Sequence, residues 1–161
     1  MFPEDPDSSV ISGMIKNPYY QTVAVNKAGV DVEVITTGLK KWKKTINNIN
    51  VHSVGDAPFK GVLRAFIYEM KMSVACIKAI LRFEPELIHI HHLNLPLISI
   101  LKRLGFIKQK LIYTAHGTST PELKAAVQGS WLKYNLLRIN GHVQHWIDIF
   151  CWHQADYLLS P

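Results

Sequence analysis

The chain has 161 residues, enough to bury a substantial core within one domain. Its hydrophobic content of 48% and charged content of 19% exclude an intrinsically disordered protein. No apolar run approaches the roughly 20 residues that a membrane-spanning helix needs, and the acidic N-terminus lacks the apolar core of a signal peptide. A cytoplasmic location is therefore expected. Cys76 and Cys151 lack a metal-binding or redox spacing and are interpreted as two buried thiols.

The formal net charge is +6, and the excess is uneven, with two groups of positive side chains. The first group is Lys40–Lys44, which includes Trp42, and the second is Lys102, Arg103, Lys108 and Lys110. A basic surface attracts nucleic acid, anionic lipid or phosphorylated small molecules, and it can equally be a solvated loop. A tryptophan among lysines suits lipid headgroups, so the favoured alternative is peripheral contact between Lys40–Lys44 and the inner face of an anionic membrane. No nucleic-acid motif is present, so no nucleic-acid partner is expected.

The first part of the chain alternates between helix and strand signals. Asn17-Pro18 predicts the cap and first residue of a helix that ends at Gly29. Alternating valines then predict a strand over Val30–Thr36. The lysine-rich segment Lys40–Lys44 is expected to be a loop.

A short strand and a long helix follow the lysines. Ile49 and Val51 mark the strand, and Asp56 opens an amphipathic helix. The helix is expected to end near Phe83, because the residue before Pro85 disfavours helical geometry.

The central part of the chain predicts a strand, a helix and a second strand. Leu87–His91 and Leu111–Thr114 are short apolar runs, and a helix capped by Asn94 and stopped by Gly105 joins them. Two strands joined by such a crossover should be parallel, with a right-handed connection.

The last part of the chain predicts a helix over Ser130–His153 and a strand over Ala155–Ser160. An α/β alternation normally begins with a strand, and none precedes the first helix. In a doubly wound sheet that first strand is central. We therefore expect an α/β protein with a Rossmann-like doubly wound parallel sheet that lacks its first central strand. Residues 1–161 would form a single domain that is cut, or completed by another polypeptide.

Histidines gather where the predicted strands end. His89, His91 and His92 lie at the end of one strand, and His116 follows the next. In parallel sheets, ligands bind outside the carboxyl ends of the strands. We therefore expect the functional site at this edge.

Several segments resemble, in chain order, the N-terminal domain of family-4 glycosyltransferases, which are retaining GT-B enzymes. Ser12-Gly13 stands where that family has a Gly-Gly loop, and 28–36 looks like its GHEVTVIT turn. Segments 85–92, 110–117 and 155–160 are similar to its PDIVHVHG, KIVYTVHG and ADYVIAVS motifs. The resemblance covers nearly the whole chain.

The resemblance implies an acceptor-binding half that faces a second domain, which holds a nucleotide-diphosphate sugar. The complete enzyme would transfer the sugar with retention to a sugar or lipid-linked acceptor in glycan biosynthesis, without a metal or other cofactor. The donor-binding C-terminal domain of the family is absent from this sequence. A second domain or chain is therefore expected to supply the donor site.

The resemblance also implies roles for individual residues. The family histidine that matches His116 contacts the transferred sugar near the reacting centre, so His116 is the expected catalytic residue. Ser12 and Gly13 match the loop near the donor diphosphate, where backbone N–H groups at a helix start favour phosphate. Ser12 departs from the family glycine, and its Cβ limits close approach of the backbone. His92, Gly117 and Thr118 are expected to line the acceptor cleft.

Two other functions remain open from the sequence. One is a non-catalytic binding module, or split subunit, of the same fold. The other is a metal-dependent hydrolase, because the pair His89 and His91 at a strand end has a spacing that binds zinc, with His116 as a third ligand. No carboxylate or lysine follows at the positions that such a hydrolase requires.

Overall fold

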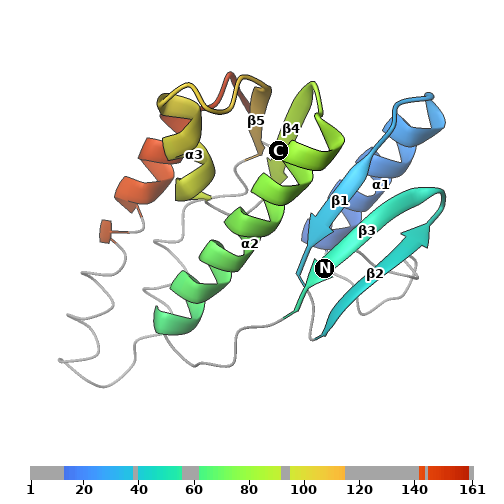
Figure 1. Ribbon diagram of the computed structural model, residues 1–161, viewed down its shortest axis with the longest axis horizontal. Helices are drawn as coiled ribbons and strands as arrows, with labels where there is room; N and C mark the ends of the chain where they lie inside the picture. The colour runs from blue at the N-terminus through green and yellow to red at the C-terminus, as the bar shows by residue number, and fades with distance from the viewer. Residues whose placement is uncertain are drawn as a thin grey trace. The chain divides into compact units, whose positions relative to one another are not determined.

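Figure 1 shows a computed structural model of the chain, which describes residues 13–37, 40–55, 62–91, 95–114, 142–143 and 145–159. The chain divides into two compact units, Met1–Pro85 and Glu86–Pro161. Each unit contains a three-stranded sheet with parallel strand pairs, which confirms the predicted α/β class.

Helix α1 (Gly13–Lys27) opens the described part of the first unit. The predicted start at Asn17-Pro18 is wrong, because the helix already begins at Gly13 and contains Pro18. Pro18 is the sixth residue of this helix, beyond the first turn where proline fits without cost, so the helix lacks one backbone hydrogen bond there. The predicted stop is correct, since Gly29 has φ +87°, a conformation that glycine adopts without strain.

The first sheet consists of β1 (Glu33–Thr36), β2 (Lys41–Ile46) and β3 (Ile49–Val54), in the order β1-β3-β2. Strand β1 is parallel to β3, whereas β2 is antiparallel to it. The strands predicted over Val30–Thr36 and at Ile49–Val51 are therefore confirmed, the first in a shorter form.

The loop expected at Lys40–Lys44 is wrong, because most of this segment belongs to strand β2. Asn47 and Asn48 form the two-residue turn to β3, with φ of 51° and 62°. Asparagine tolerates this left-handed conformation, and two such residues in succession suit a tight hairpin. The hairpin places β2 at the edge of its sheet. An edge strand can carry lysines, because their side chains reach solvent there.

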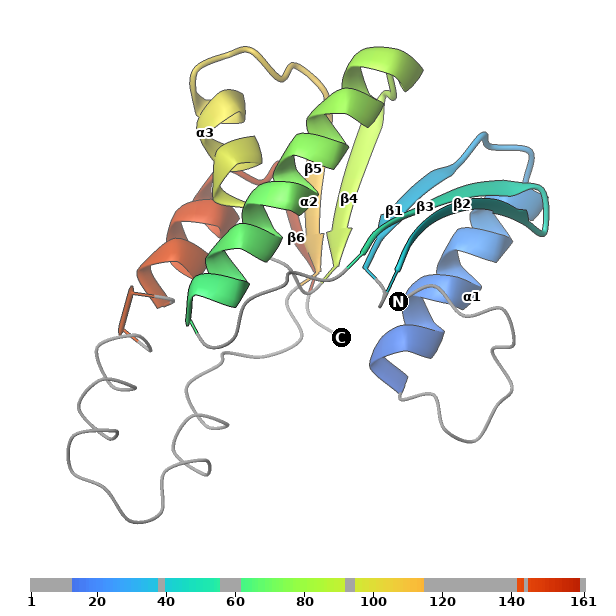
Figure 2. The same ribbon diagram turned by 60° about the horizontal axis from the view of Figure 1, so that its bottom comes forward.

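Helix α1 covers one face of the first sheet, as Figure 2 shows. Tyr19 of α1 is buried with Ile49 and Val51 of β3. Partly buried apolar side chains surround this core: Val23, Val32, Val34, Trp42 and Ile46. Helix α2 (Val62–Phe83) contacts β1 and β3 and ends where the sequence predicts.

The second unit has the predicted strand-helix-strand order. It contains β4 (Leu87–His91), α3 (Pro96–Arg103), β5 (Lys110–Thr114) and β6 (Tyr157–Leu159). The strand order is β4-β5-β6, and all pairs are parallel.

The ends of helix α3 differ in how well the sequence predicts them. The predicted cap is wrong, because Leu95 rather than Asn94 holds the N-cap position. Gly105, with φ +79°, follows the C-cap as predicted. Residues 142–143 and 145–153 are helical within the predicted helix Ser130–His153, and the rest of that prediction lies outside the described residues.

Strands β1 and β4 each lie at an edge of their own sheet within the described residues. Among the described residues, β1 pairs only with β3 and β4 pairs only with β5. The missing central strand itself remains a prediction.

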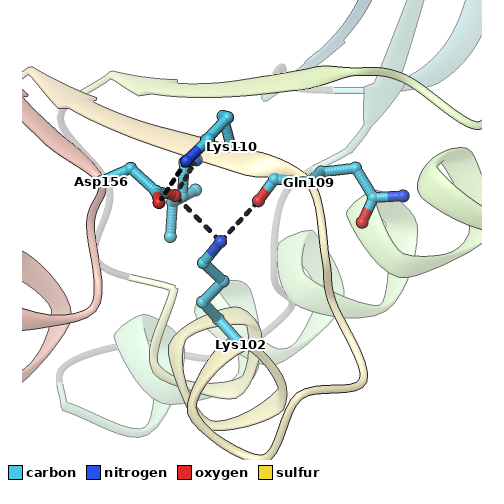
Figure 3. A network of polar contacts seen from close by, with 5 residues as sticks. Lys102, Gln109, Lys110 and Asp156 are labelled. Atoms are coloured by element: carbon cyan, nitrogen blue, oxygen red, sulfur yellow. Dashed lines mark hydrogen bonds and ion pairs between the residues drawn. The ribbon is translucent and has the colours of Figure 1, made fainter.

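Asp156 connects the start of β6 to β5 through hydrogen bonds (Figure 3). Its Oδ2 accepts a hydrogen bond from the N–H of Leu111 at 2.8 Å and lies 2.9 Å from Nζ of Lys102. Its own N–H donates to the carbonyl of Leu111 at 2.8 Å. Lys102 also donates to the carbonyl of Gln109, and Lys110 Nζ lies 3.4 Å from Oδ1 of Asp156. The hydrogen bonds from Lys102 and Leu111 lower the pKa of Asp156 to about 2.

The variant Asp156→Asn is expected to unfold more easily at neutral pH, by about 1 kcal/mol, because it loses the charge-assisted part of these bonds. A carboxylate with a lowered pKa stabilises the fold above its unfolded-state pKa, and this contribution is lost as the pH falls toward 2. The stability difference should therefore shrink between about pH 4 and pH 2. Urea unfolding across this pH range measures it, with the exposed Asp31→Asn as control. A pH-independent difference would contradict the role of the charge.

Candidate functional site

The two predicted strands next to the site end at the same edge. His91 and Thr114 are the last residues of β4 and β5, and they are partners in the parallel register. The segment after each strand therefore leaves the sheet at its carboxyl edge, where α/β proteins place ligands. Of the residues predicted to act there, His92, His116, Gly117 and Thr118 lie outside the described residues.

His89 and His91 share one face of β4. Their ring centroids lie 3.9 Å apart with an interplanar angle of 37°. Nε2 of His89 lies 2.7 Å from Oγ1 of Thr114, so the neighbouring strand engages one ring nitrogen. This contact holds the His89 ring across the β4–β5 pair at the edge of the predicted site.

The metal alternative gains no support from the described side chains. Within those residues, no group of three His, Cys, Asp or Glu side chains could hold a metal ion. His116, the third ligand in that interpretation, lies outside them. Cys76 and Cys151 are free thiols, as the sequence predicts, and Cys151 is fully buried.

Tyr113 fixes the start of helix α3. Its hydroxyl accepts a hydrogen bond from the N–H of Leu95 at 3.0 Å, and both residues are buried. Burial raises the pKa of Tyr113, so the hydroxyl stays protonated. The bond satisfies a backbone donor that helix starts leave without an intrahelical partner. Because β4 ends at His91 and α3 begins at Pro96, Tyr113 anchors one end of the connection that contains His92.

Sequence reasoning did not single out Tyr113, because a tyrosine within an apolar strand is typical of core. The only available signal was the absence of a good N-cap residue directly before Pro96. A helix start without such a residue needs a donor partner from elsewhere in the fold.

The predicted phosphate loop is described only at its second residue. Gly13 is the first residue of α1, and Ser12 lies outside the described residues. Gly13 is helical, and the role of Ser12 and Gly13 at a phosphate stays a prediction.

The expected membrane contact rested on a tryptophan exposed in a basic loop. Trp42 instead packs against the core of the first unit, and Nζ of Lys44 lies 5.7 Å from the centroid of its ring. In the part of the chain that the structure describes, no helix is both long and apolar enough to cross a bilayer.

Comparison with protein-family models decides the family. The model of the glycosyl transferase 4-like family matches residues 15–150. The chain belongs to this family. Comparison with the curated proteins and with the solved structures gives no match. The range matched by the glycosyl transferase 4-like family contains both strand ends of the candidate site, His91 and Thr114.

Proposed function

We propose that this chain is the acceptor-side half of a retaining GT-B glycosyltransferase. The complete enzyme transfers a sugar from a nucleotide diphosphate to a sugar or lipid-linked acceptor. The family match over residues 15–150 carries the proposal. The parallel strands β4 and β5, which end together at His91 and Thr114, support it because they define one edge for a cleft.

The proposed catalytic residue is His116, which follows β5 by two positions in the sequence. A neutral imidazole there orients a reacting hydroxyl, whereas a charged imidazole stabilises the departing phosphate. His92, Gly117 and Thr118 line the acceptor side of the cleft. The backbone at Ser12 and Gly13 faces the donor diphosphate. A second domain or chain completes the donor site, and no resident metal is required.

A transfer assay tests this function. The purified chain is incubated with a panel of uridine and guanosine diphosphate sugars, together with free and lipid-linked sugar acceptors. The assay measures release of nucleoside diphosphate and the anomeric configuration of the product. It is run with the chain alone and with a donor-binding domain of the same family. Transfer with retention in either arm is the expected result.

Other outcomes of the assay discriminate between functions. Acceptor binding without transfer in both arms would indicate the non-catalytic module instead. Transfer with inversion would contradict the proposed stereochemistry but not the enzyme class.

A further inference from the structure

An open pocket of about 530 Å³ lies in the first unit and contains none of the residues proposed for glycosyl transfer. Strands β1, β2 and β3 supply most of its lining, and the C-terminal end of α2 supplies Arg82 and Phe83. Its volume lies within the range of small-molecule sites.

The strand register explains why the polar side chains meet. Glu33 of β1 is the partner of Asn50 of β3, which is the partner of Thr45 of β2. These three residues form one row across the sheet, and the next row on the same face carries His52 and Lys43. The apolar side chains of β3 point to the other face, against α1.

An ion pair between a buried carboxylate and an exposed guanidinium lies at one side of the pocket. The side chain of Glu33 is only 8% exposed, and its Oε1 pairs with Nη2 of Arg82. Nε2 of His52 lies 3.5 Å from the same oxygen. Burial lowers the pKa of His52, and Lys43 and Arg82 add to this effect, while Glu33 opposes it. At neutral pH, therefore, His52 is uncharged and Arg82 balances Glu33.

The lining as a whole is positively charged and rich in hydrogen-bond donors. Lys43 and Arg82 line the pocket together with a single carboxylate, that of Glu33. The side chain of Lys44 leaves β2 on the face of Val51, where its Nζ lies 5.7 Å from the centroid of the Trp42 ring, so it is not one of these donors. A guanidinium has five N–H groups, so the pair with Glu33 leaves donors on Arg82 for a bound anion. The Thr45 hydroxyl donates to Oδ1 of Asn50 at 3.1 Å, which leaves the amide N–H groups of Asn50 as further donors.

We propose that this pocket binds a phosphate-bearing small molecule. Lys43 and Arg82 contact the phosphate oxygens, and the amide of Asn50 donates to them. The net positive charge of the lining and its several donors suit an anion with several acceptor oxygens, which phosphate provides. Phe83, which is 39% exposed, offers an apolar surface to the organic part of the ligand. The phosphate belongs either to a free metabolite or to a lipid headgroup.

The pocket lies away from the carboxyl ends of the parallel strands. Glu33 is the first residue of β1, Asn50 is the second residue of β3, and Phe83 is the last residue of α2. The chemistry of glycosyl transfer is proposed at the opposite ends of such strands. The pocket is therefore distinct from the residues proposed for transfer.

Thermal unfolding of the whole chain, in inorganic phosphate and in potassium chloride of equal ionic strength, tests the proposal. The wild-type chain should gain stability from phosphate with a saturable dependence on concentration. The variant Lys43→Gln should need about tenfold more phosphate for the same shift. The matched control, Lys41→Gln, removes the same charge from an exposed neighbour that does not line the pocket, and it should behave as the wild type.

A second arm separates the two sources of phosphate. It measures binding to phosphatidylcholine vesicles with and without phosphatidic acid. Vesicle binding that Lys43→Gln abolishes and the control retains assigns the phosphate to a lipid headgroup. Stabilisation by inorganic phosphate without vesicle binding assigns it to a free metabolite. Equal losses in Lys43→Gln and Lys41→Gln, or no effect of phosphate or vesicles beyond ionic strength, would overturn the proposal.

Discussion

Replacing His116 by alanine is expected to lower turnover by about two to three orders of magnitude. The physical reason is its proposed position next to the reacting centre, where the imidazole orients a hydroxyl or supports the departing phosphate. Removal of a group that acts only in the transition state lowers the turnover rate without a matching loss of substrate binding. The unfolding midpoint should change little. The transfer assay and thermal unfolding of the same preparations measure the two quantities.

Two further variants make the result interpretable. His153→Ala removes an exposed histidine of the same unit and should leave turnover unchanged. His116→Asn keeps a neutral hydrogen-bonding group but cannot carry a positive charge. Recovery in His116→Asn would assign the residue to hydroxyl orientation, whereas continued loss would assign it to stabilisation of the phosphate. Equal losses of activity and stability in His116→Ala would make His116 a structural residue.

Replacing Leu111 by alanine is expected to destabilise the second unit by about 3 kcal/mol. Leu111 is fully buried and lies in β5, the middle strand of the order β4-β5-β6. Its parallel partner is Ile88, and its backbone carbonyl accepts the N–H of Asp156. Truncation of Leu111 removes apolar contacts and leaves a cavity. Because β4 and β6 hold β5 on both sides, the sheet cannot easily close this cavity.

The matched control is Leu87→Ala in the adjacent strand β4. The same atoms are removed, but Leu87 is 49% exposed, so the cost should stay below about 1 kcal/mol. Chemical denaturation, followed by far-ultraviolet circular dichroism, measures both variants. Similar losses for the two would show that the core of the second unit does not depend on β5.

The sequence predicts the regular elements well where apolar residues recur with one period. Strands β4 and β5, the end of α2 and the stop at Gly105 follow from local pattern and from glycine geometry. The sequence does not predict strand β2, because a run of lysines is more typical of a loop than of a strand. In addition, Asn47-Asn48 is a weaker turn signal than a pair that contains glycine.

The same limit applies to the two candidate sites. The edge after β4 and β5 is predictable, because parallel strands joined by a short crossover must end together. The pocket of the first unit is not, because Glu33, His52 and Arg82 are distant in sequence. Only the register of β1, β3 and β2 brings the strand residues together, and that register depends on the hairpin that the pattern did not reveal.

Strand β2 has a consequence that does not depend on any ligand. Among the described residues it has a strand neighbour on one side only, so its outer edge is a template on which another chain could add a strand. Lys41, Lys43 and Lys44 are exposed along this edge, and their mutual repulsion opposes such pairing between copies. These lysines therefore protect the chain against edge-to-edge aggregation, whether or not the pocket is occupied.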